Sequence, residues 1–161
     1  MKENSIDITI INQQVLESLT AGLSGIDKDS AIKSGLSKGG EVIKKGGIQR
    51  LKSRMRAGPG GKTGNLLRSF MVRVKRNKPG VLAGFKKGKN GGNHSHLVDL
   101  GTVERMRKHK SRKRGGKGGR TGAATPNYFW NDTNDLDKSK AMSEIRMGIV
   151  EFVEKVKSKC V

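Results

Sequence analysis

Three stretches of the chain have the apolar and polar pattern of β-strands. Residues 5–10 and 70–76 alternate apolar with polar positions, as a strand with one buried face does. Residues 81–85 form a third, mostly apolar run, which the sequence Asn-Lys-Pro-Gly at 77–80 separates from 70–76. Because Pro and Gly favour turns, the sequence predicts a hairpin of 70–76 with 81–85.

Apolar residues at helical spacing predict a short helix and a long helix in the first third of the chain. Asn12 is placed to cap the short helix, which turns Val15, Leu16 and Leu19 inward. The long helix is expected over about 29–56. Its predicted inner positions are Ile32, Leu36, Gly39 or Gly40, Ile43, Gly47, Leu51 and Met55.

The long helix is unusually rich in glycine. Each interior glycine costs about 1 kcal/mol of helix stability relative to alanine. Two explanations stay open: the glycines let another backbone approach closely, or the helix breaks near Gly46 and Gly47. We expect a mostly continuous helix.

The remaining elements are a short connector, an ambiguous segment and a C-terminal helix. The sequence of residues 65–68 predicts a turn or short helix. The sequence of residues 94–101 predicts a strand or a helical turn, with Leu97, Val98 and Leu100 as the residues expected to be buried. The last helix is expected to be capped by Asp132, Thr133 or Asn134. Its predicted inner stripe contains Ile145, Ile149, Phe152, Val153 and Val156.

These elements predict one α+β domain over residues 1–161. It combines a small antiparallel or mixed sheet with a long helix in the N-terminal half, a C-terminal helix and an inserted basic loop. We expect this loop, residues 103–124, to be flexible, because it contains almost nothing apolar to bury.

Composition makes a self-sufficient core difficult. Hydrophobic residues make up 32% of the 161 residues, and 23 residues are glycine, roughly double the usual share of about 7%. Lys and Arg number 34 against 14 Asp and Glu, a net charge of +20. Such an excess opposes compaction and favours polyanions or acidic protein surfaces as partners.

The basic loop is the strongest chemical signal in the sequence. Its cations can neutralise phosphates and release counterions, which gives salt-sensitive binding without sequence preference. Docking of the loop on an acidic protein, or exposure of its charges to solvent alone, explains these cations equally well. The candidate contact residues are Arg105, Arg107, Lys108, Lys110, Arg112, Lys113, Arg114, Lys117 and Arg120. For the lysines and arginines of the long helix, a solvated face is the default expectation.

Motifs for catalysis, nucleotides and metals are incomplete. Residues 57–64 contain Gly-Lys-Thr, but the first glycine of a phosphate-binding loop is replaced by Arg56 and no strand precedes it. On a strand, His94 and His96 would share a face, with Asp99 nearby, but no further ligand has a metal-site spacing. No residue pattern resembles an activated nucleophile. We therefore expect no enzymatic activity, cofactor or metal.

The sequence favours a soluble protein made in a reducing compartment. Cys160 is the only cysteine, which rules out an internal disulfide framework. No apolar run approaches the roughly 18 residues of a membrane span, and the first residues lack the layout of a signal peptide.

The order of segments resembles that of the small head–tail joining proteins of tailed bacteriophages, also called neck or tail completion proteins. The matching features are the strand and short helix at 6–19, Thr63-Gly64-Asn65-Leu66 after a basic helix, Gly101-Thr102, and Pro126 before Tyr128, Phe129 and Trp130. The resemblance covers nearly the whole chain. This sequence departs from the family in its longer, more basic loop and in the glycines of its long helix.

The resemblance implies a structural virion protein without catalytic residues. Such proteins form rings, typically hexameric, between the head connector and the tail-tube proteins, around the channel through which double-stranded DNA leaves. We therefore expect assembly in the host cytoplasm, a final location in the virion neck, and no membrane association. Tyr128, Phe129 and Trp130 are the expected packing or assembly residues. The alternative is a free, sequence-nonspecific nucleic-acid-binding protein.

Overall fold

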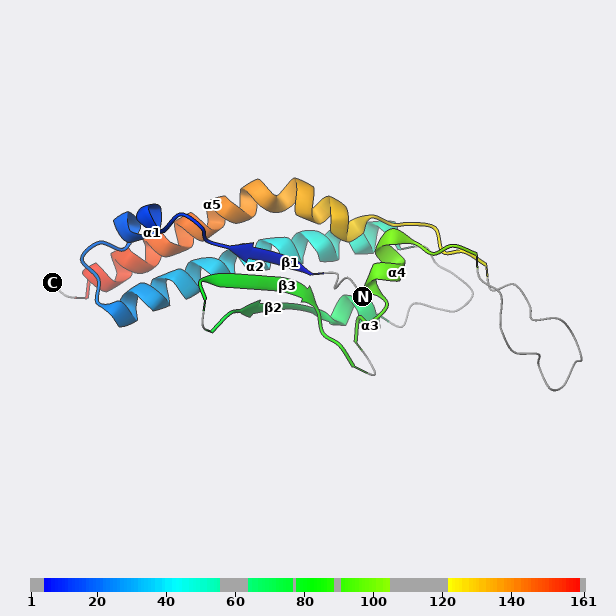
Figure 1. Ribbon diagram of the computed structural model, residues 1–161, viewed down its shortest axis with the longest axis horizontal. Coiled ribbons are helices and arrows are strands. Elements are labelled where there is room, and N and C mark those ends of the chain that lie inside the picture. Colours follow the sequence, from blue (N-terminus) through cyan, green and yellow to red (C-terminus); the bar gives the residue numbers. More distant parts are fainter. Residues whose placement is uncertain (1–4, 56–63, 77, 89–90, 105–121, 160–161) are drawn as a thin grey trace, which may run out of the picture.

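The computed structural model describes residues 5–55, 64–76, 78–88, 91–104 and 122–159. The order of elements is β1 (Ile6–Thr9), α1 (Gln13–Leu19), α2 (Gly25–Arg54), α3 (Asn65–Arg68), β2 (Phe70–Val74), β3 (Gly80–Phe85), α4 (Ser95–Leu100) and α5 (Phe129–Lys157). A small sheet packs on long helices, so the predicted α+β class is confirmed (Figure 1).

The strands form one antiparallel sheet in the order β1-β3-β2. β2 and β3 are the predicted hairpin, with Phe70 opposite Phe85. β1 pairs with the other side of β3, where Ile6 lies opposite Ala83. The strand prediction for the N-terminal segment is therefore confirmed, and the sheet is antiparallel rather than mixed.

One face of the sheet packs against α2, and α5 lies alongside α2 (Figure 1). Val81 and Ala83 of β3 are fully buried in the core on this side. Arg73, next to the packed Val72, is exposed. The alternation follows from the two-residue period of a strand.

α2 is one continuous helix of 30 residues, so the predicted continuity through Gly46 and Gly47 is confirmed. It begins at Gly25, several residues before the predicted start. The reason is a side-chain cap: Ser24 Oγ accepts a hydrogen bond from the Asp27 N–H and donates one to the Asp27 carboxylate at 2.6 Å. The cap satisfies an N–H that the helix itself leaves unpaired.

Small residues let α2 and α5 approach closely. A methyl group on Gly35 would lie 2.5 Å from the backbone oxygen of Ile145, and one on Gly148 would lie 2.9 Å from the Cα of Gly35. A methyl group on Gly39 would lie 3.0 Å from the backbone oxygen of Ala141. Of the two explanations for the glycines, close backbone approach is therefore the right one.

The face of α2 toward the sheet also depends on glycine. A methyl group on Gly40 would lie 2.5 Å from Val72 of β2, and one on Gly47 would lie 2.8 Å from the ring of Phe70, also in β2. α2 is thus packed on two faces, by α5 and by the sheet. Glycine on both faces lets the neighbouring layers approach α2 closely.

Two predicted inner residues face solvent instead. Val15 is 50% exposed, because α1 turns Leu16 and Leu19 onto the core. Leu100 is 60% exposed, because the segment 94–101 forms the helix α4 and buries Asp99. Consecutive residues in a helix point about 100° apart, so burying Asp99 turns Leu100 outward.

We predict that Gly35→Ala destabilises the protein although alanine favours helices. The added methyl group meets backbone on α5, and overpacking of this kind costs about 1–3 kcal/mol. Gly25→Ala is the matched control, because nothing lies within 4 Å of its added methyl group. Denaturant unfolding checks this; equal stability of the two variants would show that close helix contact does not require Gly35.

Candidate functional site

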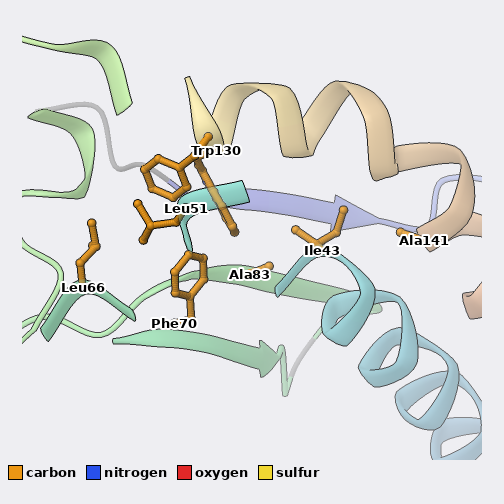
Figure 2. Close-up of a cluster of buried hydrophobic side chains, with 8 residues drawn as sticks. Ile43, Leu51, Leu66, Phe70, Ala83, Trp130 and Ala141 are labelled. Atoms are coloured by element: carbon orange, nitrogen blue, oxygen red, sulfur yellow. The ribbon is translucent and has the colours of Figure 1, made fainter. Parts of the chain in front are cut away.

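Four aromatic rings from β2, β3 and α5 meet at one end of the core. The ring centres of Phe70 and Phe85 are 4.6 Å apart, and those of Phe85 and Trp130 are 5.0 Å apart. Phe129 lies edge-on to Phe85 at 6.0 Å. Figure 2 shows Phe70, Leu51 and Trp130 pointing toward one another. Such tilted and edge-to-face contacts add to the stability from buried area.

The three neighbouring aromatic residues 128–130 have different environments. Phe129 and Trp130 are 0% and 3% exposed, and both lie in the core of the single chain. Tyr128 is 49% exposed and adopts a left-handed backbone conformation, with φ of 53°. Only Tyr128 is therefore available to a partner without unpacking the core.

Asp99 fixes the start of α5. Its carboxylate accepts hydrogen bonds from the N–H groups of Trp130 at 2.7 Å and Asn131 at 3.4 Å. Its backbone oxygen accepts from the N–H groups of Asn127 and Tyr128. A carboxylate at a helix N-terminus satisfies unpaired donors and complements the helix dipole.

The predicted cap of α5 was wrong. The helix begins at Phe129, before Asp132, Thr133 and Asn134, and its cap comes from another element. In the sequence, Asp99 is notable only for lying close to His94 and His96, the pair weighed as metal ligands. The one available signal was an acidic residue inside the apolar run Leu97–Leu100, since a carboxylate buried there needs donors.

The residues of the three later resemblance motifs gather at this end of the fold. Gly64 takes a left-handed conformation just before α3, with φ of 69°. Gly101 has φ of 73°, and a methyl group there would meet Ala124 and Pro126. Thr102 holds Ala124 by two hydrogen bonds, each 2.9 Å long. The motif residues described here therefore set backbone geometry rather than chemistry.

A groove of about 880 Å³ lies between the end of α2, α4 and residues 124–127. Arg54 lines it, and its guanidinium is bound to Asp132 at 2.6 Å and donates to the Asn127 backbone oxygen at 2.9 Å. The remaining lining is a mixture of hydroxyl, imidazole and apolar side chains: Ser53, Met55, His94, Leu97, Val98, Thr102, Ala124, Thr125, Pro126 and Asn127.

The histidine pair does not form the predicted shared face. His94 precedes α4 and His96 lies within it, so the two side chains are on a helical segment rather than on a strand. Positions two apart in a helix point in widely different directions. Among the described residues, no group of three or more His, Cys, Asp or Glu side chains could hold a metal ion.

The basic face of α2 is partly paired rather than simply solvated. Arg50 binds Asp137 of α5 through two hydrogen bonds, of 2.5 and 3.0 Å, and Lys38 pairs with Glu151. The hydrogen bonds to Asp137 raise the pKa of Arg50 above its ordinary value, against the opposing effect of burial. These pairs join α2 to α5 along their length.

All nine candidate basic residues, Arg105 to Arg120, lie outside the described residues. The described residues beside them are informative: Thr102 and Ala124, hydrogen-bonded to each other, line the groove together with Met55. Met55 directly precedes residues 56–63 in the sequence, which lie outside the described residues. The groove is therefore lined by described residues close in sequence to both of these segments.

Comparisons of the chain with protein-family models, curated proteins and solved structures find no match. Within the described ranges, no helix is both long and apolar enough to cross a membrane.

We predict that Asp99→Ala destabilises the fold by about 1–2 kcal/mol, because two N–H groups at the start of α5 lose their acceptor. Asn134→Ala, at a position predicted as the cap but exposed in the helix, is the control and should have little effect. Thermal and denaturant unfolding measure both. A greater loss in Asn134→Ala would contradict the assigned cap.

Proposed function

We propose that this chain is a structural protein of a tailed-bacteriophage virion, forming a ring at the head–tail junction around the DNA exit channel. The observation that carries the proposal is the ordered set of segments that resembles head–tail joining proteins. The positive φ of Gly64 and Gly101 supports it, because glycine adopts this conformation without strain and these motif positions therefore have a structural reason to be glycine.

The same end offers surface for subunit contacts. Leu100, Val103 and Tyr128 are 60%, 80% and 49% exposed. They belong to two segments joined by hydrogen bonds from Tyr128 to Asp99 and from Thr102 to Ala124. Exposed apolar side chains near a large groove are typical of protein interfaces. A ring would bury them, since a heterologous contact closes when its rotation divides a circle.

Charge at this end fits a DNA channel. The segment 105–121 contains nine Lys and Arg and no acidic residue, and in the sequence it lies between Thr102 and Ala124, which line the groove. Cations around a channel neutralise DNA phosphates without reading the sequence. An acidic neighbouring protein in the neck would use the same charge.

The second candidate is a free, sequence-nonspecific nucleic-acid-binding protein. The net charge of +20 and the nine Lys and Arg of 105–121 favour it. Oligomeric state distinguishes the two. Native mass spectrometry and electron microscopy of the full chain should find closed rings, and purified particles should contain the protein at the neck. A monomer that binds nucleic acid and is absent from particles would support the alternative.

We predict that Tyr128→Asn weakens ring assembly while leaving the monomer folded. The side chain is half-exposed, and asparagine tolerates the left-handed backbone of this position. Phe129→Ala is the contrasting variant, with an expected loss of about 3–5 kcal/mol of stability because the ring is fully buried. Sedimentation and unfolding experiments measure both. Unchanged assembly of folded Tyr128→Asn would exclude this residue from the interface.

We predict that charge reversal across Lys108 to Arg114 spares folding but weakens docking or DNA contact. The described core contains none of these residues. Infectivity of phage carrying the variant and DNA retention in their heads are the measurements. Full infectivity would contradict a role for the segment.

A further inference from the structure

A second cationic site lies beside the β2–β3 turn, away from the groove at α4. Figure 1 shows this turn and α4 at opposite ends of β3. It is a hollow of about 180 Å³ between the first half of α2 and the hairpin. Four cations line it: Lys33 from α2, and Lys75, Arg76 and Lys78 from the hairpin. Apolar side chains, Ile32, Leu36, Val74 and Pro79, provide the remaining wall, together with the carboxylate of Asp29.

Most of this positive charge is not neutralised within the chain. Lys75 binds Asp7 across the sheet at 2.6 Å. In the part of the chain that the structure describes, Lys33, Arg76 and Lys78 have no ion pair or side-chain hydrogen bond. Asp29 offsets only part of their charge. Like charges gathered around one hollow repel, and an anion bound there removes the repulsion.

The carboxylates of a second copy are poorly suited to fill the hollow. Asp7, Asp137, Asp132, Glu41 and Glu151 are engaged in ion pairs of their own chain. Two further ones, Asp27 and Asp99, interact at helix N-termini. These seven make up half of the 14 acidic residues in the chain, against 34 Lys and Arg, so a second copy brings few carboxylates that are not already engaged.

We propose that this hollow binds a phosphate group of a nucleic-acid backbone. Its small volume suits one compact anion, and Arg with Lys donors is the usual phosphate-binding combination. The net charge of +20 favours a polyanion such as nucleic acid as the molecule that brings this phosphate.

The proposal goes beyond ring formation and does not depend on it. The test uses the full chain with a duplex of about 20 base pairs and measures binding against salt concentration. Removing this phosphate contact with the double variant Arg76→Gln, Lys78→Gln should make the slope of log K against log salt less steep by about 0.9. The segment 105–121 stays intact, so binding remains measurable.

The matched control is Lys138→Gln with Arg146→Gln, which removes the same charge from exposed positions on α5. Its slope should equal that of the parent. Amide NMR signals of residues 74–78 should shift when the duplex is added to the parent. Circular dichroism should show that both double variants are folded, since all four replaced side chains are exposed.

Two results would overturn the proposal. One is an equal slope for the parent and the hollow variant, or an equal decrease in the control, since net charge alone would then explain binding. The other is tighter binding of poly-glutamate than of the duplex by the parent protein, with the poly-glutamate binding lost in the hollow variant but not in the control. That result would make the hollow a site for an acidic protein. Ring assembly is measured separately, so a monomer with the predicted slope change would refute the ring alone.

Discussion

Close packing of α2 against α5 is the constraint on which the rest of the structure depends. Gly35 and Gly39 bring α2 against the backbone of α5, and Gly148 makes room from the other side. On its second inner face, α2 carries the sheet and the aromatic cluster. Any side chain at these positions would separate layers that share few large apolar residues, and the core would lose its contacts at both faces.

Charge reinforces this contact along the whole helix pair. Arg50 with Asp137, Arg54 with Asp132 and Lys38 with Glu151 are three ion pairs between the helices. A carbon atom on Gly46 would overlap the Asp137 carboxylate, so glycine also makes the Arg50 pair possible. Since the chain has 34 Lys and Arg against 14 Asp and Glu, most of its cations have no acidic partner and the surface is strongly positive. Both candidate binding regions follow from that imbalance.

The sequence predicted the elements well because their patterns are local. Alternation at 5–10 and 70–76, helical spacing in α2 and α5, and the turn between the strands all depend on neighbouring residues. The start of α5 could not be found in this way, since Asp99 caps it from 30 residues earlier in the chain. The same holds for Arg50 and Asp137: partners brought together by the fold leave no local signal. The burial of Leu100 was predicted wrongly because the sequence pattern of 94–101 fits either a strand or a helical turn. As the helix α4, this segment buries Asp99 and exposes Leu100.

The glycines also affect when the protein can fold during synthesis. Gly35, Gly39, Gly40, Gly46 and Gly47 each lower helix propensity by about 1 kcal/mol, so α2 has little tendency to persist alone. Its stabilising neighbour, α5, begins only at Phe129, long after α2 has been synthesised. α2 therefore gains its close helix contact only once residues 129–157 have emerged from the ribosome.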